Sequence, residues 1–273
     1  MKQLNLAEIK QIQMDMLVEF DRVCSGHGFR YSLCGGTLLG AVRHNGYIPW
    51  DDDIDVMMPR PDFEQLMQVR PKAPYYFQSP LDTETSKPYI YSFGKMYHTN
   101  TKLIEFPSSK NIVSHVYLDI FPIDGVPSDS AEHLRLYRKV HKYILLNRAM
   151  EISYYNRDNL ALSKPKRLGW QIIWAARNVL PRKFAMKKAW KLATKYPFDQ
   201  CKEVGSLVAG YGPQEKFPAS AFSMRKKDFE GIDFSIISGY DIYLRKLYGD
   251  YMIPPPKEKR ISQHDAVAFD LTE

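Results

Sequence analysis

The stretch that decides the fold is IPWDDDIDVMMPRP, residues 48–61, in which four carboxylates stand within five positions. Two of them, Asp53 and Asp55, alternate with Ile54 and Val56, as on a β-strand whose acids share one face. Like charges on one face repel each other, and they are costly unless a cation neutralises them. Hard oxygen ligands favour Mg²⁺ or Mn²⁺, so the stretch predicts a metal site on a strand.

Two further features favour a metal site over a solvent-exposed acidic loop, the alternative for an isolated pair of aspartates. Upstream, CGGTLLG (34–40) places Gly35 and Gly36 in a turn before a helix, where backbone amides can approach a phosphate. Thr37 either contacts that phosphate or caps the helix. Downstream, Asp119 lies within an apolar β run and is the candidate third ligand. A metal beside a phosphate cradle predicts phosphoryl or nucleotidyl transfer.

The composition is that of a folded protein, with 273 residues, 44% hydrophobic and 13% aromatic. Its cysteines, Cys24, Cys34 and Cys201, show no CxxC spacing, which excludes a zinc motif or a disulfide framework and fits a reducing compartment. The first residues lack the apolar core of a signal peptide, and no apolar run approaches the ~20 residues of a membrane span. We therefore expect a cytoplasmic protein, and a location at the inner face of the membrane is compatible with the sequence.

The net charge of +7 is unevenly distributed. Residues 133–195 contain 16 Lys and Arg against only Glu151 and Asp158, so the remainder of the chain is acidic. A basic segment suggests an anionic partner, although solvated helix faces are the ordinary explanation. Within it, LGWQIIWAARNVL (168–180) combines an apolar face with flanking cations, and 164–195 is predicted to contact an anionic membrane. A core helix with a basic outer face is the alternative.

The periodicity predicts an α+β fold with strands concentrated between residues 31 and 121. Helices are expected over 4–24, 37–44, 61–70, 129–150, 165–195 and 239–252. Strands are expected at 31–36, 54–58, 88–106, 115–124, 205–212 and 221–231. The polar HTNT (98–101) is expected to turn a hairpin within 88–106, and Pro122 is expected to stop the strand that contains Asp119.

Four blocks of sequence resemble the LicD family, within the polymerase-β-like nucleotidyltransferase superfamily. They are LCGGTLLGAVRHNGYIPWDDDIDVMMPRPDF (33–63), FGKMYHTNTKLIE (93–105), YLDIFPIDGVP (117–127) and YDIYLRKLYGDYMIPPPKEKRISQH (240–264). The resemblance implies a nucleotidyltransferase-like mixed β-sheet core flanked by helices, with an additional helical region. It implies that Gly35 and Gly36 form the turn and that Asp53, Asp55 and Asp119 are the metal ligands. Asp51 and Asp52 are then extra acids, next to the metal ligands and not among them.

The resemblance also implies an activity. LicD-like proteins transfer a phospho-alcohol from a cytidine diphosphate donor to a sugar hydroxyl, with CDP-choline as the best-known donor and CDP-ribitol or CDP-glycerol as others. The acceptors are cell-surface glycans, such as teichoic acid or lipopolysaccharide, or their lipid-linked precursors. A nucleotidyltransferase that uses a nucleoside triphosphate remains a second hypothesis. A basic module that binds anionic polymers is a third; the acid cluster argues against it, and no nucleic-acid partner is expected.

Several residues are candidates for substrate contacts. Arg43 and Lys95 are placed on the donor phosphates, with an ordinary surface cation as the alternative. Arg260 and His264, in the C-terminal block, are expected to close over the site, and His264 either assists proton transfer or is a structural histidine.

A choline headgroup needs an aromatic environment because it has no hydrogen bonds to give. Trp50 is the first candidate, and Tyr47, Tyr248 and Tyr251 are others, with a core role as the alternative for each. The chain is divided into a catalytic core over 1–128, a basic helical region over 129–198, and a part over 199–273 that completes the catalytic domain.

Overall fold

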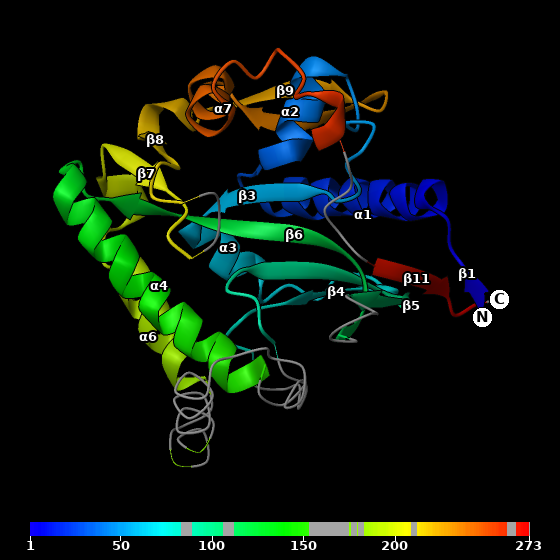
Figure 1. Cartoon of the computed structure of the whole chain (residues 1–273), viewed down its shortest axis with the longest axis horizontal. Helices are drawn as coiled ribbons and strands as arrows, with labels where there is room; N and C mark the ends of the chain where they lie inside the picture. Colours follow the sequence, from blue (N-terminus) through cyan, green and yellow to red (C-terminus); the bar gives the residue numbers. More distant parts are fainter. Residues whose placement is uncertain are drawn as a thin grey trace.

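The computed structural model of the chain describes residues 1–82, 89–105, 112–152, 175, 179, 183–208, 212–260 and 266–272. Its centre is a large mixed sheet with the strand order β1-β11-β5-β6-β3-β2 (Figure 1). These strands are β1 (Lys2–Gln3), β2 (Ser32–Leu33), β3 (Asp55–Pro59), β5 (Gly94–Glu105), β6 (Ile112–Val126) and β11 (Ala266–Asp270). β4 (Tyr75–Gln78) also pairs with β5, and β7 (Glu203–Gly205) joins β6 to β8 (Lys216–Pro218). The α+β class predicted from the sequence is confirmed.

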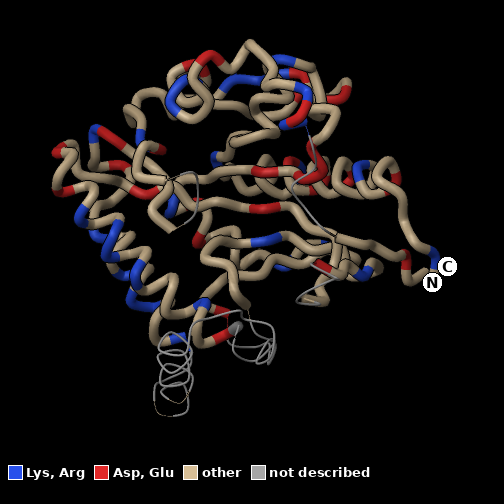
Figure 2. The backbone as a smooth tube through the Cα atoms, viewed as in Figure 1, with Lys and Arg blue, Asp and Glu red and all other residues tan. Residues whose placement is uncertain are grey.

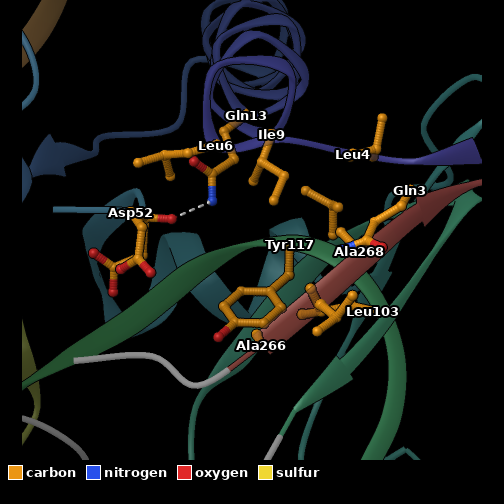
Figure 3. Close-up of a pocket in the computed structure, with 13 residues that line it drawn as sticks. Gln3, Leu4, Leu6, Ile9, Gln13, Asp52, Leu103, Tyr117, Ala266 and Ala268 are labelled. Carbon is orange, nitrogen blue, oxygen red and sulfur yellow. Dashed lines mark hydrogen bonds between the residues drawn. The ribbon is translucent and has the colours of Figure 1, made fainter. Parts of the chain in front are cut away.

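The first helix, α1 (Leu6–His27), packs against the sheet through an apolar stripe. Asn5 and Glu8 begin it with a reciprocal capping box, and Gly28 ends it in the left-handed conformation that glycine adopts without strain. Phe20 and its apolar neighbours on the inner side are fully buried. Because α1 runs along the sheet, the residues at its start lie over the edge where β11 joins β5 (Figures 1 and 3).

The pairing of three strands brings the acidic residues together. β3 and β6 are parallel, and their register places Asp55 opposite Asp119. β5 and β6 are antiparallel, and their register places Lys95 opposite the same Asp119. Residues that face each other across neighbouring strands point to the same side of a sheet. The topology therefore fixes two carboxylates and one ammonium in a row across β3, β6 and β5.

The hairpin expected at HTNT is wrong, because β5 continues through these residues. The register with β6 shifts between His98 and Leu103, which marks a β-bulge rather than a turn. Thr101 holds the bulge: its hydroxyl donates to the carbonyl of His98 and accepts from the amide of Val116. Polar residues that resemble a turn are thus accommodated by an irregularity in one long strand.

The expectation that Pro122 stops β6 is also wrong. The strand runs on to Val126, and Pro122 still pairs with Met58 of β3. Pairing with β5 ends at Ile120, and pairing with β7 begins only at Asp124. Pro122 stands where the ladder changes partners, so its missing N–H removes no strand-to-strand hydrogen bond.

Two helices of the basic region, α4 (Ser130–Ile152) and α6 (Phe184–Ala193), pack side by side at one end of the sheet (Figure 1). Their outer surface carries a row of exposed cations, seen along α4 in Figure 2. We call the exposed cations of these two helices and of the turn after α6 the basic face; they are Arg135, Arg138, Lys139, Lys142, Arg148, Lys187, Lys188, Lys191 and Lys195. Most of the segment 164–195, including its tryptophan pair, lies outside the described residues. No helix among the described parts of the chain is long and apolar enough to cross a membrane.

The C-terminal part returns to the core at several points. The strand expected at 205–212 is wrong over residues 206–208, because β7 ends at Gly205, and residues 209–211 lie outside the described part of the chain; β9 (Met224–Phe229) confirms the strand expected at 221–231. β10 (Ile232–Ile237) pairs with β9 and has no counterpart in the sequence prediction; α7 (Tyr240–Tyr248) lies beside α2 (Gly35–Arg43) (Figure 1). The last strand, β11, has no counterpart among the strands expected from the sequence. The predicted division at 128 and 198 remains a prediction.

Candidate active site

Five carboxylates gather where β3 begins. Carboxylate oxygens of Asp51, Asp52 and Asp53 lie within 4.8 Å of one another. Asp55, the first residue of β3, and Asp119, its register partner on β6, are both buried, with 8% of each exposed. Asp53 lies two residues before β3 and lines the same cavity as Asp55, so the two acids border one site although only Asp55 belongs to the strand. The acids are therefore a loop triplet above a buried strand pair.

The negative charges of these carboxylates repel one another. Burial raises the pKa of Asp55 well above its ordinary value, and the charges of Asp53, Asp119 and Asp51 raise it further. Lys95 opposes this shift. Its Nζ lies 2.6 Å from Oδ1 of Asp119, and its side chain is only 1% exposed. One ammonium offsets part of the negative charge and leaves a strong preference for further positive charge.

The donor set fits a divalent cation. Asp53 and Asp55 line the same cavity, and Asp119 is the register partner of Asp55, while the three carboxylates whose oxygens lie within 4.8 Å of one another among the described residues are Asp51, Asp52 and Asp53. Hard oxygen ligands of this kind suit Mg²⁺ or Mn²⁺ rather than a softer metal. Asp51 and Asp52 belong to the same cluster, so they are closer to the site than a purely outer role would require.

The start of α2 lies directly beside these acids. Gly35 is left-handed, with φ of 53°, and its N–H donates to the hydroxyl of Tyr243 at 3.3 Å. Tyr243 in turn donates to Glu215. A side chain at Gly36 would overlap the carboxylate of Asp51, so glycine is required there by close approach. The predicted glycine turn is thus the first turn of the helix itself.

Thr37 has a role that the sequence did not indicate. Its hydroxyl accepts a hydrogen bond from the backbone N–H of Asp55 at 2.9 Å, and α2 has no side-chain cap. The capping interpretation of Thr37 is therefore wrong. The hydrogen bond ties the start of α2 to the start of β3 and so fixes Asp55 relative to the glycines.

The larger of two cavities at this site has a volume of about 620 Å³. Gly36, Asp53 and Asp55 line it on one side, and residues of the C-terminal block, including Tyr248, Tyr251 and Lys259, line the other. The predicted residues Arg43 and Trp50 also line it. Residues of the C-terminal block therefore share this cavity with the acids, and the closure of Arg260 and His264 over the site remains a prediction.

Cations and aromatic rings stand together around the larger cavity. Arg43 donates to the carbonyl of Tyr251 at 2.6 Å, which anchors the covering segment. Burial and the nearby charge of Arg260 lower the pKa of Arg43. The Arg260 guanidinium lies over the ring of Trp50, 5.3 Å from its centre. His264 lies outside the described residues. The remaining candidate, Tyr47, packs against Phe229 and does not line this cavity.

A smaller cavity, about 190 Å³, also borders the acidic loop (Figure 3). It is lined by the start of α1, by β5, β6 and β11, and by Asp52 and Asp53. Gln13 reaches down from α1 and donates to the carbonyl of Asp52 at 3.0 Å, the contact drawn in Figure 3. Asp53 thus belongs to the walls of both cavities.

The structure brings most of the predicted site residues together. Gly36, Arg43, Trp50, Asp53 and Asp55 share one cavity. Gly35, Thr37, Lys95, Asp119 and Arg260 surround it through the contacts above. Lys95 has a carboxylate partner, and its predicted contact with a donor phosphate remains a prediction. Sequence reasoning missed the Gly35–Tyr243–Glu215 relay, Lys259 and the smaller cavity, since each depends on contacts between segments far apart in the chain.

A mixed sheet that carries paired aspartates on adjacent strands, beside a glycine-started helix, is the arrangement of the nucleotidyltransferase class. The family model described as "LicD/FKTN/FKRP, nucleotidyltransferase domain" matches residues 28–150, which contain all five acids. The chain is also 31% identical over 278 aligned residues to the lipopolysaccharide cholinephosphotransferase LicD of Haemophilus influenzae, covering 99% of this chain and 100% of that protein.

Shorter matches concern more distant relatives. Ribitol 5-phosphate transferase FKRP of Homo sapiens is 46% identical over 48 residues, which are 18% of this chain and 10% of that protein. An uncharacterized protein of Rickettsia typhi, RT0683, is 33% identical over 72 residues, 26% of this chain and 23% of that protein. The full-length similarity to the Haemophilus protein decides the matter: the chain belongs to the LicD family.

Proposed function

We propose that the protein transfers phosphocholine from CDP-choline to a sugar hydroxyl of a cell-surface glycan or its lipid-linked precursor. The observation that carries this proposal is the acid group at the base of a cation-lined cavity. The end-to-end similarity to a lipopolysaccharide cholinephosphotransferase supports the choice of choline. The protein is on this basis an enzyme, a phosphotransferase of the CDP-alcohol type.

The larger cavity holds the cytidine diphosphate part of the donor. Arg43, Lys259 and the adjacent Arg260 supply positive charge to the diphosphate. Trp50 and Tyr248 offer ring faces to the base. Gly36, which has no side chain, lets the carboxylate of Asp51 lie close to the backbone of α2 at this cavity.

The proposed cofactor is Mg²⁺ or Mn²⁺, held by Asp53, Asp55 and Asp119. When bound, such a cation neutralises charge on the diphosphate and on the attacking oxygen. The hydrogen bond from Asp55 N–H to Thr37 and the pairing of Lys95 with Asp119 keep the two strand acids in place. Positioning of this kind supplies much of the catalysis in phosphoryl transfer.

The reaction exchanges one phosphorus–oxygen bond for another. The acceptor hydroxyl oxygen bonds to the phosphorus that carries choline, and the bond from that phosphorus to the bridging oxygen of CMP breaks. CMP leaves with the electron pair of that bond. We assign the hydroxyl proton to a carboxylate oxygen of Asp119, next to the site of attack.

The acceptor and the location are the less constrained parts of the proposal. Lipopolysaccharide and teichoic acid are both glycans of the required kind, and the relative from Haemophilus is named for the first. The basic face of α4 and α6 suits an anionic membrane, where lipid-linked precursors are found (Figure 2). We therefore place the protein in the cytoplasm at the inner face of the membrane.

One alternative has a specific observation behind it. The short match to ribitol 5-phosphate transferase favours a CDP-ribitol donor, but it spans only 48 residues. A CDP-glycerol donor, a nucleoside triphosphate donor and a binding module without activity remain the further alternatives.

The test is release of CMP from CDP-choline in the presence of Mg²⁺, compared with CDP-ribitol, CDP-glycerol and CTP. The proposal predicts release from CDP-choline above the other donors and its loss in Asp53→Ala. Preference for CDP-ribitol, or pyrophosphate release from CTP, would replace the proposed donor. Salt-sensitive binding to anionic glycan that survives Asp53→Ala, without turnover of any donor, would establish the binding module instead.

A further inference from the structure

The two cavities that share Asp53 differ sharply in charge. Arg43 and Lys259 line the larger one, and Arg260 stands beside it. The described residues that line the smaller one include Asp52 and Asp53 but neither lysine nor arginine. Asp51, Asp53 and Asp55 also line the larger cavity, so it carries charges of both signs, whereas a positively charged headgroup meets carboxylates without a lining lysine or arginine in the smaller one. The two cavities therefore differ in their cations, because only the larger one has arginine or lysine among its described lining residues.

Apolar and polar groups both line the smaller cavity. Leu6 and Ile9 reach into it from α1, Leu103 from β5, and Ala266 and Ala268 from β11 (Figure 3). Its volume of about 190 Å³ is below the roughly 300–1,000 Å³ of pockets for drug-sized ligands. The space therefore suits a compact headgroup of a few heavy atoms.

Two polar side chains of this cavity, Gln13 and Tyr117, are already engaged in hydrogen bonds. Gln13 donates to the carbonyl of Asp52, and its side-chain oxygen accepts from the hydroxyl of Tyr47. The hydroxyl of Tyr117 donates to Glu105 at 3.2 Å. A polyol such as ribitol would bury hydroxyls against apolar walls with few partners, which is unfavourable. A quaternary ammonium has no hydrogen bonds to satisfy and loses nothing there.

We infer that the smaller cavity receives the trimethylammonium headgroup of the donor. This inference rests on the proposed function and sharpens it: the apolar walls select against polyol donors, and Asp52 and Asp53 supply the negative charge. The ring of Tyr117 contributes less to binding the headgroup, because the Lys95 ammonium already lies 3.1 Å from the centre of that ring. The aromatic group around Trp50, in the larger cavity beside three cations, then serves the nucleotide rather than choline.

The test fills the cavity from one wall. Ile9→Phe extends a ring into it, and Ala266→Leu fills it from the opposite wall should the first variant fail to fold. Val18→Phe is the matched control, since Val18 lies on the same helix, is 43% exposed and lines neither cavity. KM and kcat are measured with CDP-choline and CDP-ethanolamine, and saturation transfer from protein to the trimethyl protons of CDP-choline is recorded by NMR.

The inference predicts that Ile9→Phe raises KM for CDP-choline by roughly tenfold or more, with a much smaller effect on the smaller ethanolamine headgroup. It also predicts that the trimethyl saturation signal of the native protein is lost in Ile9→Phe and retained in Val18→Phe. Equal increases in KM for both donors, a change confined to the KM of the acceptor, or an unchanged NMR signal would overturn it.

The two proposals fail separately. If the folded native protein turns over no CDP-alcohol, the proposed function is wrong, and the NMR experiment still decides the cavity. Trimethyl saturation that disappears in the filled variants would support the headgroup site, whereas its absence from the native protein would reject it. If CDP-choline is turned over but filling the cavity changes nothing, only the headgroup site is wrong.

Discussion

Replacement of Lys95 by methionine tests the charge balance of the site. Lys95 Nζ lies 2.6 Å from Asp119 Oδ1, with 1% of the lysine side chain and 12% of the aspartate side chain exposed. Methionine keeps similar bulk but removes the ammonium, so Asp119 and Asp55 face each other without it. Removing one partner of a buried pair costs about 3–5 kcal/mol. Because Asp119 is slightly exposed, we expect the lower end of that range.

A loss of about 3 kcal/mol corresponds to a fall in Tm of roughly 6 °C or more for a chain of this size. A cation bound at Asp119 would supply part of the missing charge, so Mg²⁺ should stabilise Lys95→Met more than the native protein. Thermal unfolding with EDTA and with saturating Mg²⁺ measures both effects. Lys216→Met is the matched control, because Lys216 pairs with Glu203 at 2.7 Å and lines neither cavity.

Two results would refute this reasoning. An unchanged Tm of Lys95→Met in EDTA would show that the ion pair does not stabilise the strand pair. An equal effect of Mg²⁺ on the native protein and on Lys95→Met would show that the cation does not bind near Asp119. If the reasoning is right, the added substitution Asp119→Asn restores stability in EDTA and abolishes the extra response to Mg²⁺.

Three other predictions follow from the geometry. Gly36→Ala pushes a methyl group into Asp51 and should lower kcat/KM for CMP release by roughly tenfold or more. Gly26→Ala is the control, because the space around Gly26 is open, and it should leave kcat/KM unchanged. Arg60→Ala removes a buried bidentate partner of Asp124 and should lower the free energy of unfolding in denaturant by about 3–5 kcal/mol. KM of the folded fraction should be unaltered, and an unchanged denaturant midpoint would contradict the prediction. The double substitution Arg138→Glu and Lys142→Glu reverses charge on the basic face, and it should abolish pelleting of the protein with anionic vesicles without changing CMP release. Pelleting that persists in this variant, or that occurs equally with zwitterionic vesicles, would contradict the proposed membrane contact.

Local pattern was sufficient to predict much of the site. The aspartates at 53 and 55, the paired glycines at 35 and 36, and the later Asp119 could be identified because each lies in a distinctive short context of apolar or turn-forming residues. The strand that contains Asp55 and the helix that follows the glycines are also where the pattern placed them. Alternation and helix-start preferences are local properties, so a single sequence reveals them.

The register of the strands and the return of the C-terminal segment to the sheet could not be predicted in the same way. Nothing in the sequence states that Lys95 faces Asp119, because the number of residues absorbed by the bulge at Thr101 decides it. β11 has no counterpart among the strands expected from the sequence, and only its pairing with β5 makes Ala266 a wall of the smaller cavity. Contacts between distant segments determine these features, and they give the site its charge balance and its second cavity.

The most direct test of the central claim follows transfer itself. Choline-labelled CDP-choline is incubated with Mg²⁺ and a glycan acceptor that bears free sugar hydroxyls, and label in the glycan and CMP in solution are measured together. We predict that the native protein yields equal amounts of both, and that Asp55→Asn, folded by the same thermal criterion, yields neither. Label transfer that continues in Asp55→Asn, or that is unaffected by removal of divalent cations, would contradict a metal-dependent transfer at these aspartates.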